Sequence, residues 1–375
     1  MSVIFVLPDF KSDNLRLQPW LTFYRVAKEM QAQGQTVAVI TDVVNDGPVD
    51  GIEVIGVCSL RSSGRSQILA MLEEKQATTV FVPVTPLSLM TCSWYKDLSR
   101  YKAYAFMSYA FYNTKEMSRA WPYLTPASRK SFGKHLLIPR LLWRSRLTRH
   151  FSGVISQSVT TQQRMVGLGV EASYVHYIPP GTDSELWNSE TKQADDRAEG
   201  SILYLGSPYA IRGFELLLDA MALIDNEAIK LRVLARGATG ERREELLQDL
   251  ASRGLAGKVI IEGGWLDVER LKDEIQAARA VALPFVLVPS ELPVTVYEAI
   301  ASGTPVIGTR IDGLPSAVGK AGVLVDVGDE KALQEAIERV VLDTSYRQQL
   351  EQHCKAQGAA LPSWRQVAEQ WSELS

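Results

Sequence analysis

The chain is poor in cysteine and histidine and has no long apolar run. Three cysteines and four histidines occur among its 375 residues. The cysteines are odd in number and lie far apart, so neither a disulfide framework nor a metal cluster is indicated, and we expect reduced thiols. No segment approaches the roughly 18 uninterrupted apolar residues of a membrane-spanning helix. The first residues, MSVIFVLPDFKSDN, lack the basic start and the small-residue cleavage site of a signal peptide, which predicts a cytoplasmic protein.

Acidic residues are also missing from one long segment. None occurs from Met117 to Val170, where the basic residues are Arg119, Arg129, Lys130, Lys134, Arg140, Arg144, Arg146, Arg149 and Arg164. Residues 1–195 hold 21 basic and 16 acidic residues, whereas residues 196–375 hold 19 and 27. The two halves therefore carry opposite net charges, which predicts that they face different partners.

The basic segment also contains apolar residues. Between residues 129 and 149 the cations are mixed with Leu137, Ile138, Leu141, Leu142 and Trp143. This mixture is typical of a surface that docks on anionic lipid, at the inner face of the cytoplasmic membrane. Pro139 interrupts the helical pattern, however, and a packed helix with solvated arginines is the alternative. Nucleic-acid binding is disfavoured, because the chain as a whole is acidic and shows no aromatic stacking module.

Strand-like apolar runs alternate with helix-like segments along the chain. The first run, SVIFVLP, precedes a helical segment, PWLTFYRVAKEMQAQG, and the runs TVAVITD, GIEVIGV and TTVFVPV follow. The alternation starts again at SILYLGS and continues through LRVLARG, KVIIEGG, AVALPFV and TPVIGTR. Such alternation predicts parallel sheets covered by helices. We expect an α/β protein with two Rossmann-like, doubly wound domains that face each other across a cleft.

A polar, acid-rich stretch separates the two alternating patterns. In SETKQADDRAEG, residues 189–200, the composition shifts and the apolar periodicity fails, so we place the linker near residues 185–200. The predicted N-terminal domain covers residues 1–190, and the C-terminal domain covers residues 191–355. Residues 356–375 are expected to form a C-terminal helix that packs back on the N-terminal domain.

In the second domain, the loop after the first strand has features of an anion site. In LGSPYAIRGFELL, Gly206 permits a tight turn and Arg212 lies where the next helix opens. A cation beside a helix start suits a phosphate. An ordinary turn between a strand and a helix, with a surface arginine, is the alternative.

A short helix is predicted in SELPVTVYEAIASG. Pro293 fits its first turn, and Gly303 supplies a left-handed stop. The first amides, those of Val294, Thr295 and Val296, would then be unpaired and could seat a phosphate. Further along the helix, Glu298 could accept hydrogen bonds from a ribose diol. A helix of this kind with a purely structural role is the alternative.

These segments resemble the GT-B glycosyltransferases of family 4. The donor-binding signature of that family is similar to PSELPVTVYEAIASGTPVIGTRIDGLPSAVGKAGVLVDVGDEKALQEAI, and its Gly-Arg…Lys-Gly loop is similar to YLGSPYAIRGFELLLDAM. YIPPGTDSELW and GVISQSVTTQQRMVGLGV resemble family segments at the end of the first domain. The resemblance covers roughly residues 150–345. It implies a metal-free enzyme that uses a nucleotide sugar, such as a UDP- or GDP-sugar, as its donor.

The resemblance also implies roles for individual residues. Glu298 would hold the donor ribose, Arg212 would stand where the family's phosphate-binding lysine stands, and the amides from Val294 to Val296 would face the diphosphate. The family separates its two glutamates by seven residues, whereas six separate Glu291 and Glu298, so Ser290 stands at the aligned position. Glu291 and Ser290 therefore both remain candidates for the place beside the transferred sugar.

Other positions depart from the family pattern. Ser207 stands where the family has the first of its two phosphate-binding cations, so Arg236 is our candidate for the second cation, with a solvated surface arginine as the alternative. The loop PDFKSDNLRL has no glycine, although the family often has a Gly-Gly loop there. The stretch YAFMSYAFYNTKEM offers Ser108, Tyr109 and Tyr112 where the family often has a histidine.

Transfer does not require that histidine. In a retaining transfer of the family type, the departing phosphate oxygen can take the proton of the acceptor, and stabilisation of the leaving diphosphate becomes the main catalytic effect. The chain has no Asp-x-Asp triplet, so we expect no metal and no cofactor, with Arg212 and the helix amides neutralising the diphosphate. Arg212, Glu291 and Glu298 are thus the predicted catalytic residues.

The sequence therefore predicts a retaining, nucleotide-sugar-dependent hexosyltransferase. Its acceptor would be a lipid-linked molecule, a glycolipid or a polysaccharide precursor. A nucleotide-sugar 2-epimerase of the same fold is an alternative, because it shares the two facing domains but needs no acceptor site. A catalytically silent GT-B partner protein is another, in view of the missing histidine, the short acidic spacer and Ser207.

Overall fold

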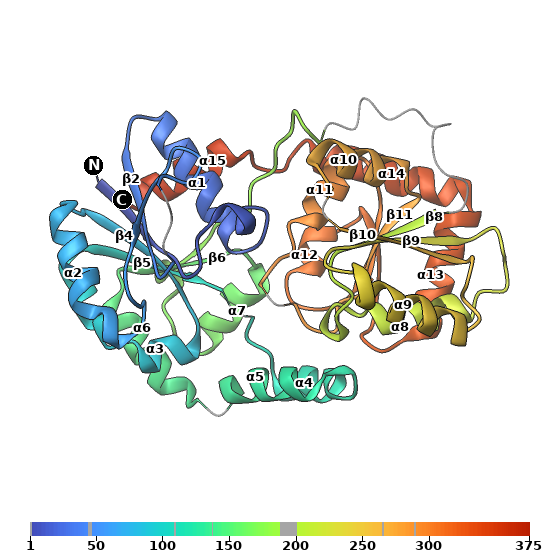
Figure 1. Ribbon diagram of the computed structural model, residues 1–375, viewed down its shortest axis with the longest axis horizontal. Helices are drawn as coiled ribbons and strands as arrows, with labels where there is room; N and C mark the ends of the chain where they lie inside the picture. The colour runs from blue at the N-terminus through green and yellow to red at the C-terminus, as the bar shows by residue number, and fades with distance from the viewer. Residues whose placement is uncertain are drawn as a thin grey trace.

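The computed structural model describes residues 2–43, 47–108, 110–136, 138–187, 201–264, 266–288 and 290–375. Two lobes lie side by side, and each is built around a sheet (Figure 1). Every strand pairing in both sheets is parallel. Large apolar clusters cover both faces of each sheet, which explains why the strands read as continuous apolar runs rather than as alternating patterns. The expected α/β class with two Rossmann-like domains is confirmed.

The first sheet has seven strands in the order β3-β2-β1-β4-β5-β6-β7. The strands are β1 (Ser2–Val6), β2 (Thr36–Thr41), β3 (Glu53–Gly56), β4 (Thr79–Val84), β5 (Lys102–Met107), β6 (Gly153–Ser156) and β7 (Val175–Tyr177). The helices of this lobe include α1 (Trp20–Ala32), α2 (Arg65–Glu74), α3 (Pro86–Thr91), α6 (Arg140–His150) and α7 (Val159–Gly167). The strand order reverses between β1 and β4, where sheets of this kind bind ligands at their carboxyl ends.

The second sheet has six strands in the order β10-β9-β8-β11-β12-β13. The strands are β8 (Ser201–Leu205), β9 (Lys230–Ala235), β10 (Val259–Gly263), β11 (Ala280–Leu283), β12 (Val306–Thr309) and β13 (Gly322–Val325). The helices are α8 (Phe214–Ala222), α9 (Gly240–Ser252), α10 (Val268–Ala277), α11 (Thr295–Ala301), α12 (Leu314–Val318), α13 (Glu330–Leu342) and α14 (Thr344–Gly358). Here the reversal lies between β8 and β11, so the loops after these strands should border a ligand.

The last helix, α15 (Trp364–Glu373), returns to the first lobe. It packs on α1 and places Trp371 against Phe23 and Phe81, with ring centroids 5.3 Å and 4.8 Å apart. Residues 356–358 still belong to α14, which packs on α11, so the returning helix begins later than the expected residue 356. The predicted linker is described only up to residue 187, and the predicted boundary at residues 190 and 191 lies outside the described residues.

An arm between β5 and β6 crosses from the first lobe to the second. It contains α4 (Thr114–Ala120), the short helix η4 (Trp121–Tyr123) and α5 (Pro126–Leu136). The hydroxyl of Tyr112 donates to the carbonyl of Val288 at 2.7 Å and accepts from its amide at 2.6 Å. Met117, Ala120 and Leu124 belong to the same apolar cluster as the core of the second lobe. The sequence did not predict this arm.

The basic segment forms α5 and α6, with Pro139 immediately before α6. Leu141 and Leu142 are 67% and 50% exposed, whereas Trp143 is 2% exposed and packs inward, so it is not part of the apolar surface that we expected. Leu137 lies outside the described residues. None of the helices within the described ranges is both long enough and apolar enough to cross a membrane.

Candidate functional site

The loop after β8 fixes the position of Arg212. Gly206 has a φ of +119°, and a Cβ there would lie 1.6 Å from Nη1 of Arg212, so only glycine leaves room for the guanidinium. The guanidinium carbon lies 5.4 Å from the ring centroid of Phe285, and Nη1 donates to the carbonyl of Leu205 at 3.4 Å. Gly213, with a φ of +71°, lets α8 start directly after Arg212. The backbone thus holds one cation at the carboxyl end of a central strand.

A second cation, Arg236, lies in the adjoining loop after β9. The pKa of the Arg236 guanidinium is lowered by burial and then by the positive charge of Arg212, so the two side chains are electrostatic neighbours. Ser207 is buried, and its hydroxyl donates to the main-chain carbonyl of Arg236 at 3.2 Å, which ties the loop after β9 to the loop after β8. An anion between the two arginines would offset their mutual repulsion.

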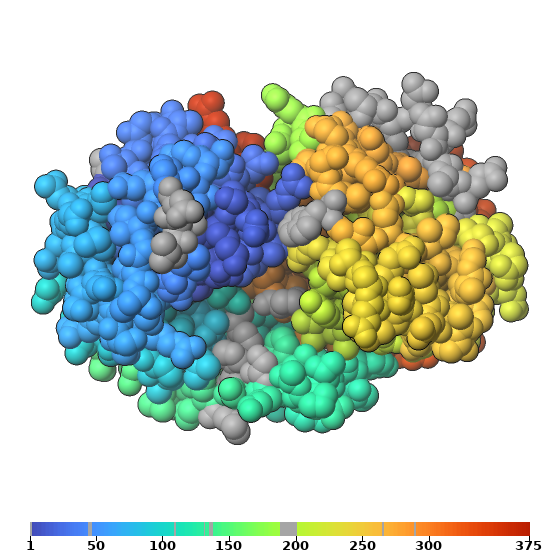
Figure 2. All heavy atoms as spheres, viewed as in Figure 1, coloured from blue at the N-terminus to red at the C-terminus, as the bar shows by residue number. Residues whose placement is uncertain are grey.

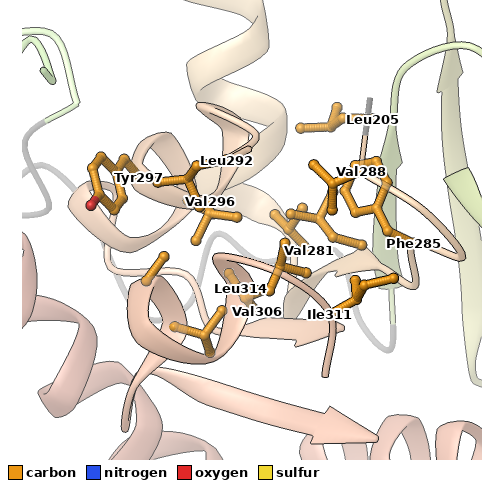
Figure 3. Packing of buried hydrophobic residues seen from close by; sticks show 14 of the residues in the cluster. Leu205, Val281, Phe285, Val288, Leu292, Val296, Tyr297, Val306, Ile311 and Leu314 are labelled. Carbon is orange, nitrogen blue, oxygen red and sulfur yellow. The ribbon is translucent and has the colours of Figure 1, made fainter. Parts of the chain in front are cut away.

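The predicted short helix is present as α11. Gly303, which follows the end of this helix, has the expected left-handed conformation, with a φ of +72°. Val296 packs into the apolar cluster together with Leu292 and Leu314, which fixes the rotation of the helix (Figure 3). The amide of Val296 donates to the carbonyl of Pro293 at 3.1 Å, so our expectation that it would be unpaired was wrong. The amides of Val294 and Thr295 lie N-terminal to this hydrogen bond, which is the first of the helix.

Glu298 lies on α11 and is half-buried. Burial raises the pKa of its carboxyl to about 7, although Arg16, Arg25 and the Thr295 hydroxyl all act to lower it. Both arginines belong to the first lobe. The surface is hollowed where the blue first lobe meets the yellow second lobe (Figure 2). The carboxyl of Glu298, in the second lobe, is thus influenced by the positive charges of Arg16 and Arg25 in the first lobe.

Glu291 does not face an open site. Its side chain is 1% exposed and accepts hydrogen bonds from Ser156 Oγ at 3.0 Å and from the main-chain N–H of Gln157. Burial, and next the charge of Asp312, raise the pKa of its carboxyl well above the usual range. The structure therefore places this predicted sugar-binding residue in the contact between the lobes. The neighbouring Ser290 is half-buried.

The sequence did not reveal the role of Asp312. Its Oδ1 accepts a hydrogen bond from Ser158 Oγ at 3.1 Å, and its carbonyl accepts one from Thr160 Oγ1 at 2.8 Å, so two residues at the start of α7 bind it across the lobe boundary. It is 3% exposed, and burial raises the pKa of its carboxyl to about 7. Its φ is +42°, and the Asp-Gly pair at residues 312 and 313 is a local sequence signal of a turn at this position.

The expected residues of the first lobe are not gathered at one point. Ser108 Oγ donates to the carbonyl of Val84 at 3.1 Å, and Tyr112 is buried against Val288. Tyr109 lies outside the described residues. Arg16, which the sequence did not single out, reaches the second lobe instead. Within the described ranges, no group of three histidine, cysteine or acidic side chains is arranged to hold a metal ion.

Comparison with known proteins shows what the second lobe resembles. Residues 199–343 match the family model described as Glycosyl transferases group 1. The D-inositol 3-phosphate glycosyltransferase of Corynebacterium urealyticum is 32% identical over 213 residues, which are 52% of this chain and 50% of that protein. The chain thus spans about half the length of this curated relative.

Solved structures match over the whole chain. Sucrose-phosphate synthase from Thermosynechococcus elongatus superposes with a TM-score of 0.78 at 19% identity, covering 100% of this chain and 98% of that one. Anabaena HepE in complex with UDP-glucose gives a TM-score of 0.74 at 16% identity, covering 100% and 98%. The second lobe thus matches the sequence pattern of the group 1 glycosyl transferases, and the whole chain has the fold of these solved structures.

Proposed function

We propose that the protein is a retaining glycosyltransferase that moves a hexosyl group from a nucleotide sugar to a lipid-linked, glycolipid or polysaccharide-precursor acceptor. One observation carries the donor half of this proposal. Gly206 leaves room for Arg212 in the loop after β8, and Ser207 binds this loop to Arg236 in the loop after β9, at the carboxyl end of the central strands, where sheets of this type bind ligands. Two neighbouring guanidinium groups at such a place suit a diphosphate.

The proposed donor is a UDP- or GDP-sugar. Anabaena HepE, whose fold this chain shares, was solved with UDP-glucose. Glu298 would accept hydrogen bonds from the ribose diol, and Arg212 and Arg236 would bind the phosphates without a metal. Ser207 contributes no charge, but its bond to the Arg236 carbonyl keeps the two loops together.

The proposed reaction breaks the bond between the anomeric carbon and the diphosphate oxygen. A new bond forms between that carbon and the acceptor hydroxyl oxygen on the same face of the sugar. The acceptor proton passes to the departing phosphate oxygen, and the products are the glycoside and the nucleoside diphosphate. Arg212 stabilises the charge that develops on the leaving group, which is the kind of contribution that typically dominates such a step.

The proposed acceptor side is the basic surface of the first lobe. Leu141 and Leu142 stand out from α6 between Arg140 and Arg149, which are exposed as well. Apolar side chains flanked by cations suit an anionic lipid surface. We therefore propose a peripheral position at the inner face of the cytoplasmic membrane, where a lipid-linked acceptor would be reached.

A thermal-shift screen against UDP, GDP, ADP and their sugars tests the donor proposal. A ligand at 100 times its dissociation constant should stabilise the wild type by about 2.7 kcal/mol. Glu298→Ala should abolish this stabilisation while the unliganded protein still unfolds cooperatively. Glu335→Ala, which removes an exposed glutamate of α13, is the matched control and should respond like the wild type.

Product analysis separates the remaining possibilities. Release of nucleoside diphosphate only when an acceptor is supplied supports the transferase. Conversion of one nucleotide sugar into another without acceptor would show a 2-epimerase. If the wild type binds no nucleotide and no nucleotide sugar, the protein is a silent member of the fold and the proposal is wrong.

A further inference from the structure

Arg16, in the loop after β1, reaches across the boundary between the lobes. Nη1 of Arg16 donates to the carbonyl of Leu266 at 2.9 Å, although the two residues are 250 positions apart in the chain. Leu266 lies in the loop between β10 and α10, at the carboxyl edge of the second sheet. Arg16 follows the short helix η1 (Ser12–Asn14), in the part of the first lobe where no glycine occurs between Leu7 and Trp20.

The charge of Arg16 also acts on the carboxyl of Glu298. This positive charge is the largest of the effects that counter the burial of the Glu298 carboxyl, and that of Arg25 is the next. Arg25 is already engaged in another contact, because its Nη2 lies 3.8 Å from Oδ2 of Asp183 in the chain segment that leaves the first lobe. Arg16, by contrast, is an exposed side chain that donates to a neutral carbonyl of the second lobe.

The contact with Leu266 adds little to holding the lobes together. A solvent-exposed hydrogen bond to a neutral acceptor contributes only a small net free energy. The buried contacts between the lobes lie elsewhere, from Ser156 and Gln157 to Glu291 and from Tyr112 to Val288. Arg16 can therefore leave the carbonyl without opening the boundary.

A diphosphate would give Arg16 a stronger partner. A guanidinium binds a phosphate through two parallel, charge-assisted hydrogen bonds, which are stronger than one bond to a neutral carbonyl. The second lobe offers Arg212 and Arg236, whereas Ser207 supplies no charge. A third cation from the opposite lobe would help to balance the charge of a bound diphosphate.

We propose that Arg16 is a donor-binding residue supplied by the first lobe, whose guanidinium exchanges the Leu266 carbonyl for the diphosphate of the bound nucleotide. This inference rests on the proposed function, because it assumes that a nucleoside diphosphate occupies the site formed by Arg212, Arg236 and Glu298. It makes the presence of the first lobe a condition for tight donor binding.

The test compares two ligands that differ only in their phosphates. The dissociation constant of the nucleoside diphosphate that the screen identifies is measured by calorimetry, and that of the corresponding nucleoside by ligand-observed NMR. Arg16→Ala should weaken diphosphate binding about 10-fold to 100-fold, as expected for the loss of a charge-assisted hydrogen bond, and leave nucleoside binding unchanged. Arg16→Lys should recover part of the loss, because the charge is kept.

Lys11→Ala is the matched control. Lys11 belongs to the same loop but pairs with Asp9 at 2.9 Å, so its removal should leave both dissociation constants unchanged. Unchanged diphosphate binding in Arg16→Ala would overturn the inference. Equal losses for diphosphate and nucleoside would also overturn it, because they would show that Arg16 only braces the lobes. Failure of the wild type to bind any nucleotide would instead refute the proposed function, and this is seen before any variant is made.

Discussion

Ser156 of the first lobe donates a hydrogen bond from its hydroxyl to Oε1 of Glu291 in the second lobe, at 3.0 Å. The main-chain N–H of Gln157 donates to the other carboxyl oxygen. Glu291 is buried, so these two donors take the place of water. The family pattern would put a glutamate near this position beside the sugar, whereas here the carboxyl binds the turn between β6 and α7.

Glu291→Ala should therefore destabilise the protein rather than change its choice of ligand. The substitution leaves the buried N–H of Gln157 without its acceptor, whereas the Ser156 hydroxyl can still donate to the carbonyl of Ser158 at 2.9 Å. An unpaired buried donor typically lowers the free energy of unfolding by about 1–3 kcal/mol. Affinities for a nucleoside diphosphate and for its sugar should change by the same factor. Urea denaturation and calorimetry measure the two effects, with Glu335→Ala as the control. If only the affinity for the nucleotide sugar fell, the result would show that Glu291 contacts the transferred sugar.

Asp312→Asn should alter the pH dependence of stability. Burial raises the pKa of Asp312 from 3.8 to about 7, so between these pH values the folded protein binds more protons than the unfolded chain. The contribution of this group to the free energy of unfolding therefore falls as pH rises through that window. Removing the charge should stabilise the protein at pH 8 by up to about 4 kcal/mol, with little change near pH 4.

Chemical denaturation at pH 5 and pH 8 measures this difference. Asparagine tolerates the positive φ of residue 312, so the backbone should not change. The exposed Asp225 provides the control, because Asp225→Asn should leave the pH dependence as it is in the wild type. If Asp312→Asn keeps the full pH dependence of the free energy of unfolding, other groups cause that dependence.

The sequence was sufficient to predict the features that depend on local pattern. Continuous apolar runs such as SVIFVLP mark strands buried on both faces, and the glycines at 206 and 303 mark positive φ values that the structure has. These local signals located the two parallel sheets, the loop of Arg212 and the helix of Glu298.

Features that depend on contacts between distant segments were not predictable in this way. Nothing in the local sequence of Glu291 shows that Ser156 lies opposite, and the partners of Asp312 are more than 150 positions away. The same holds for Arg16 and Leu266, and for Tyr112 and Val288. Each of these pairs forms only because two separately folded lobes meet, which hydrophobic periodicity does not encode.

Arg212→Ala should lower the turnover number about 100-fold, because it removes a donor that stabilises the leaving diphosphate. Added magnesium should not restore the rate. Single-turnover measurements with saturating donor isolate this step from binding. Arg243→Ala, which removes an exposed arginine of α9, should leave turnover unchanged. A strong dependence of the wild type on a divalent ion would contradict the metal-free proposal.

Replacing Arg140 and Arg149 by glutamine should weaken binding to anionic vesicles about 30-fold, since each cation near such a surface contributes about 1 kcal/mol. Arg144 and Arg146 are left in place, because they donate to the carbonyls of Leu168 and Met90.

Vesicle co-sedimentation at low and at physiological salt measures this effect. Adding Leu141→Gln should weaken vesicle binding further, because it removes an exposed apolar side chain. The vesicle binding that remains should then depend less on apolar insertion. Lys320→Gln on the second lobe is the control and should bind like the wild type. If the wild type does not bind anionic vesicles at low salt, the arginines are ordinary solvated side chains.

Donor affinity should increase as the pH rises through about 7, because only the ionised carboxylate of Glu298 can accept both hydrogen bonds of a ribose diol. Burial raises the pKa of this carboxyl to about 7, so below that pH the group is increasingly protonated and the affinity should fall, by at most about tenfold per pH unit. Calorimetry of the nucleoside diphosphate between pH 5.5 and pH 8.5 gives the profile. The terminal phosphate titrates as well, and Glu298→Gln isolates its contribution. The difference between the two profiles should therefore be largest at high pH and vanish at low pH; parallel profiles would mean that Glu298 does not hold the ribose.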